Sequence, residues 1–163
     1  MSNISTLRRI LGANRTLAIV GLSPQWHRPS FFAAKYMQAH GYRIVPVNPG
    51  ATEILGECCY PSVTAAADAL AKDGLKIDMV DCFRKSKDIA PIADEAIAIG
   101  AKCLWLQLGV SNEAAEAKAL TAGLDVVVNR CVKIEHARLF GGLNWVGVNT
   151  RVISARRPQQ LPY

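Results

Sequence analysis

The sequence alternates short apolar runs with segments of helical periodicity, and this alternation restricts the fold more than any other feature. Five apolar runs each end in a glycine, an asparagine or a polar turn, as parallel strands do when both of their faces are buried. We therefore expect five strands that are separated by helices. The runs cover residues 16–21, 42–47, 77–83, 102–109 and 124–129.

The segments between these runs carry the start and stop signals of helices. Pro29 and Ser30 stand where a helix begins, and Gly41 stands where that helix would end. Ser62 is placed to cap the next helix, over residues 63–72. Further helices are expected over residues 91–99 and 113–121 and around Ile4, Leu7 and Leu11.

Strict alternation with short links requires a parallel sheet with helices on both faces, because each right-handed crossover must bury its own apolar stripe. The predicted fold class is α/β, a Rossmann-like three-layer α/β/α arrangement around a five-stranded, mainly parallel sheet. The expected strand order is 3-2-1-4-5. Ligands of such sheets lie beyond the carboxyl ends of the strands where the strand order reverses, here between the first and fourth strands.

The chain length favours one folded body with extensions at its two ends. Half of the 163 residues are hydrophobic, which is enough for one well-buried core. We expect an N-terminal helix in residues 1–15, a nucleotide-binding body in residues 16–140 and an extension or tail in residues 141–163. The segment "NWVGVNTRVIS" could pair with a sheet edge or with a second subunit of a homodimer, or it could belong to a free tail.

The net charge of +6 does not indicate a nucleic-acid-binding surface. Residues 16–150 carry 13 basic and 13 acidic side chains, so the predicted body is neutral overall. The surplus comes from arginines near the two ends, with no interleaved aromatic residues of the kind that a single-strand binder uses for stacking. These arginines are Arg8, Arg9, Arg15, Arg151, Arg156 and Arg157.

Neither a membrane span nor a secretion signal is expected. No uninterrupted apolar stretch approaches the roughly 18 residues that span a bilayer, and the first 15 residues lack an apolar segment followed by a small-residue cleavage site. The five cysteines include no CxxC pair and no metal-ligand spacing with the three histidines. We therefore expect a cytoplasmic protein in a reducing compartment.

The loop after the first strand suggests a phosphate-binding site. Gly21 could let the backbone approach a phosphate, with the amides of Leu22 and Ser23 as hydrogen-bond donors. Arg28 could pair with an anionic oxygen, and Ser30 could donate its hydroxyl at the start of the helix. The alternative is that the glycine only ends a strand and that the other residues are a cap and a surface charge.

The same loop departs from the NAD fingerprint. G-x-G-x-x-G requires glycines where Ser23 and Trp26 stand, and the acidic residue that holds the ribose hydroxyls is replaced by Val47, Asn48 and Pro49. An NAD(P)-dependent oxidoreductase is therefore an alternative and not the leading interpretation.

The loop after the third strand adds positive charge. Phe83 offers an apolar or stacking surface, and Arg84, Lys85 and Lys87 follow it. Cations beside an adenosine site could meet a ribose phosphate, which NAD does not carry. The alternative is a solvated basic turn that is balanced by neighbouring aspartates.

Six ordered segments together resemble the family of small stand-alone CoA-binding domains. That family is similar in fold to the CoA-binding domain of the succinyl-CoA synthetase alpha subunit, so the resemblance implies that coenzyme A or an acyl-CoA lies across the switch point. The synthetase's phosphohistidine belongs to a different domain, and ligation chemistry is not implied. The segments are "VGLSPQWHRPS", "GYRIVPVNP", "EILGECCYPS", "DCFRKS", "AIGAKCLWLQLGV" and "GLDVVVNRCVKIEH".

The resemblance also implies a role for each group of site residues. Those expected to hold the pyrophosphate are Gly21, Leu22, Ser23, Arg28 and Ser30. Those expected around the adenosine and its ribose phosphate are Val47, Asn48, Pro49, Phe83 and Arg84. Those expected beside the pantetheine arm, mainly through backbone atoms, are Gln107, Leu108 and Gly109.

One cysteine is a weak candidate for a catalytic role. Cys131 follows the fifth strand, and Glu135 and His136 come four and five residues later. A thiol near a base could attack an acyl thioester or form a mixed disulfide with CoA. The alternative is a buried structural thiol, and the leading interpretation is a CoA-binding module without catalysis.

Overall fold

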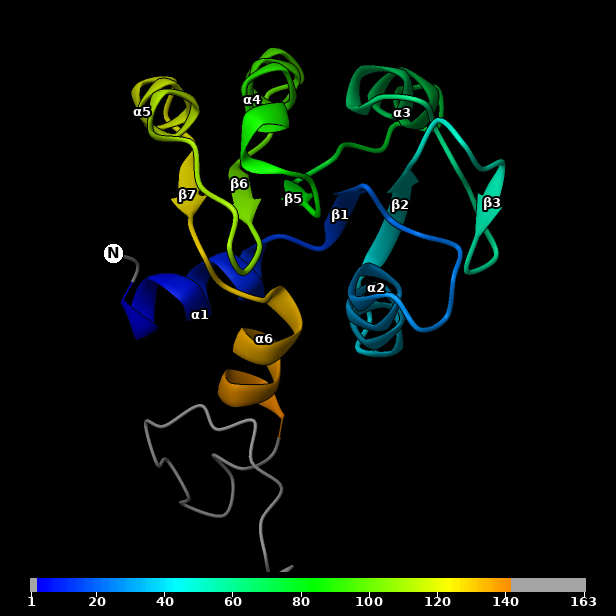
Figure 1. Ribbon diagram of the computed structural model, residues 1–163, viewed down its shortest axis with the longest axis horizontal. Coiled ribbons are helices and arrows are strands. Elements are labelled where there is room, and N and C mark those ends of the chain that lie inside the picture. The colour runs from blue at the N-terminus through cyan, green and yellow to red at the C-terminus, as the bar shows by residue number, and fades with distance from the viewer. Residues whose placement is uncertain (1–2, 142–163) are drawn as a thin grey trace, which may run out of the picture.

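A five-stranded parallel sheet lies between two layers of helices in the computed structural model, which describes residues 3–141 (Figure 1). The sheet has the strand order β2-β1-β5-β6-β7. All of its strand pairs are parallel. The strands are β1 (Thr16–Val20), β2 (Arg43–Val47), β5 (Met79–Cys82), β6 (Cys103–Leu106) and β7 (Asp125–Val127).

Helices of the described residues cover both faces of the sheet (Figure 1). Side chains alternate between the faces, so that in β1 Leu17 and Ile19 belong to one hydrophobic cluster while Ala18 and Val20 belong to the other. One face carries α1 (Ile4–Ala13), α2 (Pro29–Ala39) and α6 (Val132–Phe140). The other carries α3 (Val63–Ala71), α4 (Ile89–Ala98) and α5 (Glu113–Thr121).

The predicted α/β fold class is confirmed, but the expected strand order is wrong. The third main strand, β5, lies beside β1 in the middle of the sheet, so the order is 2-1-3-4-5 in the numbering of the five expected strands. All four residues of β5 are buried, as a central strand requires. The strand order therefore reverses between β1 and β5, and not between the first and fourth strands.

The outer edge of β2 contains a proline and is covered by the segment around Tyr60, which explains why the third strand does not pair there. Pro46 cannot donate a backbone hydrogen bond, so it favours an edge strand. The Tyr60 amide donates to the Pro46 carbonyl at 3.0 Å, and the Asn48 amide donates to the Tyr60 carbonyl at 2.9 Å. This returning segment contains a hairpin that the sequence did not indicate, formed by β3 (Glu53–Ile54) and β4 (Glu57–Cys58).

The helix boundaries follow the caps that the sequence indicates. The Ser62 hydroxyl accepts from the Ala65 amide at 3.1 Å, and the Asn112 side chain accepts from the Ala115 amide at 3.0 Å. Helix α4 starts two residues earlier than expected, after the short 3-10 turn η1 (Ser86–Asp88), and α6 was not among the expected helices.

The helix expected near the N-terminus is present. Helix α1 forms where expected and buries Leu7 and Leu11 in the core, while Ile4 stays 42% exposed. The segment "NWVGVNTRVIS" lies outside the described residues. No helix within residues 3–141 is long and apolar enough to cross a membrane.

Candidate functional site

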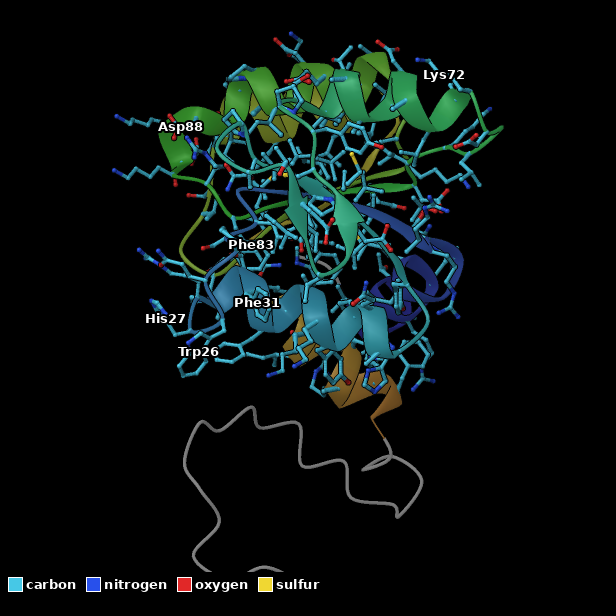
Figure 2. All side chains as sticks on the ribbon, turned by 90° about the vertical axis from the view of Figure 1, so that its right-hand side faces the viewer. Trp26, His27, Phe31, Lys72, Phe83 and Asp88 are labelled. Atoms are coloured by element: carbon cyan, nitrogen blue, oxygen red, sulfur yellow. The ribbon has the colours of Figure 1, made fainter. Side chains whose placement is uncertain are left out.

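The loops that leave the carboxyl ends of the strands gather at one edge of the molecule. Figure 2 shows Trp26 and His27, from the loop after β1, at the same edge as Asp88, which follows β5, while Lys72 lies at the opposite edge. Because β1 and β5 are neighbours at the switch point, their two loops meet directly.

Gly21 is a point of close contact between these loops. Its φ angle is +82°, and a Cβ atom added there would lie 2.4 Å from the Phe83 carbonyl oxygen. Its amide donates to the Val47 carbonyl at 2.9 Å. A glycine is therefore required at this position by its positive φ angle and by the close approach of Phe83.

Hydrogen bonds hold the β1 loop in shape. The Ser23 amide donates to the Ser30 hydroxyl at 3.0 Å, which ties the loop to the first turn of α2. The Asn48 side chain donates to the Leu22 carbonyl at 2.9 Å, which ties the β2 loop to the β1 loop. Arg28 donates to the side chain of Gln25 at 3.2 Å. These hydrogen bonds hold the loop in one conformation. They also occupy the Ser23 amide, which we expected to donate to a phosphate and which donates to Ser30 instead.

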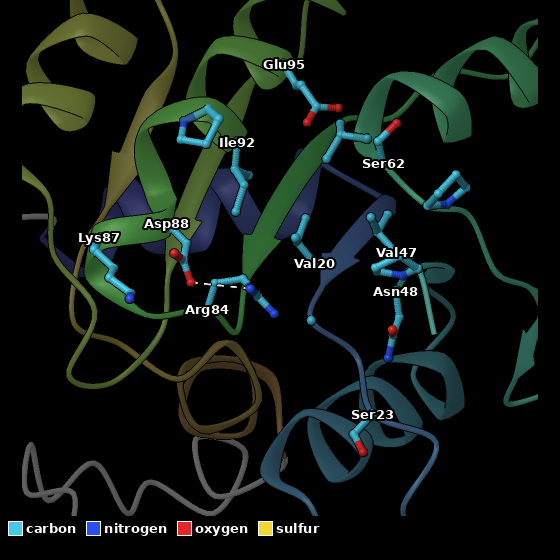
Figure 3. A pocket seen from close by; sticks show the side chains of 15 residues that line it. Val20, Ser23, Val47, Asn48, Ser62, Arg84, Lys87, Asp88, Ile92 and Glu95 are labelled. Carbon is cyan, nitrogen blue, oxygen red and sulfur yellow. Dashed lines mark hydrogen bonds and ion pairs between the residues drawn. The ribbon is translucent and has the colours of Figure 1, made fainter. Parts of the chain in front are cut away.

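A cavity of about 450 Å³ opens on the α4 side of the β1 loop; we call it the α4-side cavity (Figure 3). Its floor is apolar, from Val20, Val47 and Ile92. Its walls carry polar and charged groups, which include Ser23, Asn48, Ser62, Arg84, Lys87, Asp88 and Glu95.

Basic side chains extend the rim of this cavity. Arg84, Lys85 and Lys87 line an adjoining hollow of about 510 Å³ together with Phe83 and Asp88. The Arg84 guanidinium forms an ion pair with the Asp88 carboxylate at 3.3 Å, and half of the Arg84 side chain is exposed (Figure 3). An exposed pair of this kind is weak, so an incoming anion could compete for the guanidinium.

A second cavity, of about 650 Å³, opens on the other side of the β1 loop beside α2; we call it the α2-side cavity. It shares Gly21 and Ser23 with the α4-side cavity. Its lining is mostly apolar or neutral, and Arg28 is the charged member. The lining residues include Gln25, Pro29, Ser30, Phe83, Gln107, Leu108, Val110 and Cys131.

A buried carboxyl group lies behind the α2-side cavity. The Asp81 side chain is fully buried, and its Oδ1 accepts from the Gln107 side chain at 2.6 Å. Burial raises the pKa of Asp81 to about 7, and the Gln107 hydrogen bond acts in the opposite direction. Sequence reasoning did not select Asp81, although a charged residue inside an apolar strand is a visible signal.

Glu135 and His136 are paired with residues other than Cys131. Only Cys131 lines the α2-side cavity, and burial raises the pKa of its thiol, which disfavours the thiolate. The Glu135 carboxylate is paired with the guanidinium groups of Arg130 and Arg138. The His136 ring bonds to the Tyr36 hydroxyl at 3.1 Å.

The structure brings most of the residues selected from the sequence to the two cavities. Leu22 and Gly109 line neither: the Leu22 side chain is buried in the core, and the Gly109 amide donates to the Asn129 side chain at 2.8 Å. Those on the α4-side cavity are Gly21, Ser23, Val47, Asn48, Pro49 and Arg84. Those on the α2-side cavity are Gly21, Ser23, Arg28, Ser30, Phe83, Gln107 and Leu108.

Sequence reasoning missed the residues that α3 and α4 add to the α4-side cavity. Ser62 caps α3. Glu95 of α4 accepts from the Thr64 amide of α3 at 2.7 Å and so joins the two helices. For Ser62 the signal was its place at the start of a helix, whereas Glu95 lies within α4 and had no local signal. The described residues contain no group of three or more His, Cys, Asp or Glu side chains that could hold a metal ion.

Comparison with known proteins gives consistent matches over the body of the chain. Residues 15–137 match a family model described as a CoA binding domain. The Bacillus subtilis protein YneT is 36% identical over 131 residues, which are 80% of this chain and 92% of that protein.

Two solved structures are similar in both sequence and fold. A protein from Pyrococcus horikoshii is 40% identical with a TM-score of 0.78, and the match covers 86% of this chain and 94% of that one. A protein from Thermus thermophilus is 31% identical with a TM-score of 0.74, and the match covers 85% of this chain and all of that one.

Proposed function

The chain belongs to the CoA-binding domain family, and from this premise we propose that it binds coenzyme A or an acyl-CoA across the β1 loop without covalent chemistry. The observation that carries the proposal is the pair of cavities that meet at Gly21 and Ser23. Coenzyme A has the matching shape, since a diphosphate joins its nucleotide to its pantetheine arm.

We assign the nucleotide to the α4-side cavity. The apolar floor suits the faces of adenine, and the charged walls suit the ribose and its phosphate. Arg84, Lys85 and Lys87 on the adjoining rim would pair with the 3′-phosphate. The absence of an acidic residue at Val47, Asn48 and Pro49 fits a phosphorylated ribose better than the free hydroxyls of NAD.

We assign the diphosphate to the β1 loop and the pantetheine arm to the α2-side cavity. The start of α2, at Pro29 and Ser30, lines that cavity beside Arg28, so the positive end of the helix and a guanidinium would both attract the diphosphate. The mostly neutral lining suits an uncharged arm. Cys131 lies beside it with a raised thiol pKa, which supports binding without attack on a thioester.

Calorimetry with three ligands tests this function. We expect CoA to bind, dephospho-CoA to bind more weakly by about tenfold or more because the charge-assisted contacts to the 3′-phosphate are missing, and NAD to bind weakest. At a hundredfold excess over its Kd, CoA should raise the free energy of unfolding by about 2.7 kcal/mol. Equal affinity for all three ligands would contradict the assignment of the ribose phosphate, and no binding of CoA at millimolar concentration would overturn the function.

A further inference from the structure

A fully buried aspartate stands in the middle of the sheet, where side chains are otherwise apolar. Asp81 of β5 lies in register with Ile19 of β1 and Trp105 of β6. Alternation along the strand points its side chain to the same face as that of Met79, toward the cluster of α1, α2 and α6. A carboxyl group at such a place is costly to bury, so its hydrogen bonds are informative.

The two oxygens of this carboxyl group differ. Oδ1 accepts from Gln107 Nε2 at 2.6 Å, whereas Oδ2 has no hydrogen-bond partner among the described residues. An apolar side chain would fill this place without leaving a buried oxygen that lacks a hydrogen-bond partner. The aspartate is therefore poorly explained by stability alone, and its one strong contact is with Gln107.

That contact fixes which end of the Gln107 amide faces the cavity. Gln107 Nε2 donates to Asp81 Oδ1, and the ionised carboxylate, which prevails above about pH 7, can only accept, so in that form it keeps the Nε2 end of the amide toward Asp81. The opposite end, Oε1, receives no hydrogen bond from residues 3–141, and Gln107 lines the α2-side cavity while only 4% of the residue is exposed. The hydrogen bond from Gln107 Nε2 to Asp81 thus leaves the acceptor oxygen Oε1 on the side of the α2-side cavity.

We propose that Asp81 is a positioning residue, which holds Gln107 so that Oε1 accepts a hydrogen bond from an amide N–H of the pantetheine arm. The proposal rests on the proposed function, because the arm is what brings secondary amides into the α2-side cavity. The α2-side cavity would then be selective beside Gln107 Oε1: a ligand that places an N–H donor there is favoured over one that places a carbonyl there.

The test compares ligand affinity and stability in the variant Asp81→Leu. Without its partner the Gln107 amide can rotate, so CoA should bind roughly three- to tenfold more weakly, the effect of one hydrogen bond. Adenosine 3′-phosphate 5′-diphosphate, which is the nucleotide half of CoA without the arm, should bind as it does to the unaltered protein. The variant should be at least as stable to heat, because a buried carboxyl group has been removed.

Two further variants separate positioning from packing. In Asp81→Asn the amide oxygen can still accept from Gln107 Nε2, so CoA affinity should stay within about twofold of the unaltered protein. Gln107→Met keeps the bulk of the side chain and removes Oε1, so it should lose CoA affinity as Asp81→Leu does. This variant also provides the test if Asp81→Leu does not fold.

The inference is overturned if Asp81→Leu or Gln107→Met binds CoA with unchanged affinity, or if either weakens both ligands equally. It is also overturned if Asp81→Asn loses as much CoA affinity as Asp81→Leu. These results leave the proposed function intact provided that the unaltered protein binds both ligands. Failure of the unaltered protein to bind either ligand removes the proposed function, and this inference with it.

Discussion

The two cavities beside the β1 loop share a wall but differ in chemistry. The α4-side cavity carries Arg84, Lys87, Asp88 and Glu95, whereas Arg28 is the charged residue on the lining of the α2-side cavity. The point where the strand order reverses therefore has a charged cavity on one side of the β1 loop and a largely neutral cavity on the other. This difference in charge is the basis on which we propose the direction of the ligand, with its nucleotide on the charged side of Gly21 and its arm on the neutral side.

The largest expected effect comes from Gly21→Ala, because Gly21 belongs to both cavities. A Cβ atom would meet the Phe83 carbonyl at 2.4 Å in a backbone conformation with φ of +82°, so we expect a loss of about 3 kcal/mol or more in the free energy of unfolding. Affinity for CoA and for its nucleotide half should fall together. Chemical denaturation and calorimetry measure both effects.

Gly109→Ala is the matched control for this substitution. Gly109 has a φ of +75° but nothing within 4 Å of an added Cβ, so the cost should be about 1 kcal/mol from backbone strain alone. Equal losses in the two variants would mean that the loop crossing at Gly21 does not determine the site.

The next largest effect concerns Asp81, on the α2 side. Its pKa is raised from 3.8 to about 7 in the folded protein, so the folded state binds this proton more tightly than the unfolded state. The stability of the unaltered protein should then fall as pH rises from about 4 to 7, by at most about 4 kcal/mol from this group, and level off above pH 7. Asp81→Asn should lack this contribution.

Urea denaturation of the unaltered protein and of Asp81→Asn from pH 4 to pH 8 checks this prediction. The nearby thiols of Cys82, Cys103 and Cys131 have pKa values raised by burial and stay neutral in this range. A stability difference between the two proteins that does not change with pH would show that Asp81 titrates normally.

A smaller effect is expected on the α4 side, from Arg84→Ala. Loss of one charge-assisted contact should weaken CoA by about tenfold and leave dephospho-CoA almost unchanged. Arg9→Ala is the matched control, since Arg9 is also exposed and also paired with an aspartate, Asp125, at 2.7 Å, yet lines neither cavity. If Arg84→Ala weakens both ligands equally, the 3′-phosphate does not lie on this rim.

The smallest effect is expected for Cys131→Ser. Its thiol lines the α2-side cavity but has a raised pKa, so CoA affinity should change by less than about threefold, and iodoacetamide should react slowly with this cysteine at pH 7. Mass spectrometry after timed alkylation measures the rate. Rapid alkylation, or a mixed disulfide with CoA that forms readily, would revive the thiol-exchange alternative.

The sequence was sufficient for the fold class and for most of the loop residues that line the two cavities. Local signals such as the Ser62 and Asn112 caps and the apolar runs act within a few residues, so they can be read without the tertiary structure. The strand order was missed because right-handed crossovers allow both orders. Pro46 carried the missing information, since a residue without an amide hydrogen favours the sheet edge that the segment around Tyr60 now covers.

The parts of the site that could not be predicted depend on contacts between distant segments. Asp81 and Gln107 are 26 residues apart and meet only because β5 and β6 are neighbours. The need for a glycine at position 21 likewise comes from Phe83, across the switch point. Both contacts depend on which strands are neighbours. With the incorrect strand order, neither contact could be predicted.

The most direct test of the account is a crystal structure of the protein with coenzyme A. We expect the diphosphate at Gly21 and Ser23, the adenosine in the α4-side cavity with its 3′-phosphate near Arg84, and the arm in the α2-side cavity beside Gln107. A ligand bound in the opposite direction, or bound away from the β1 loop, would contradict the account.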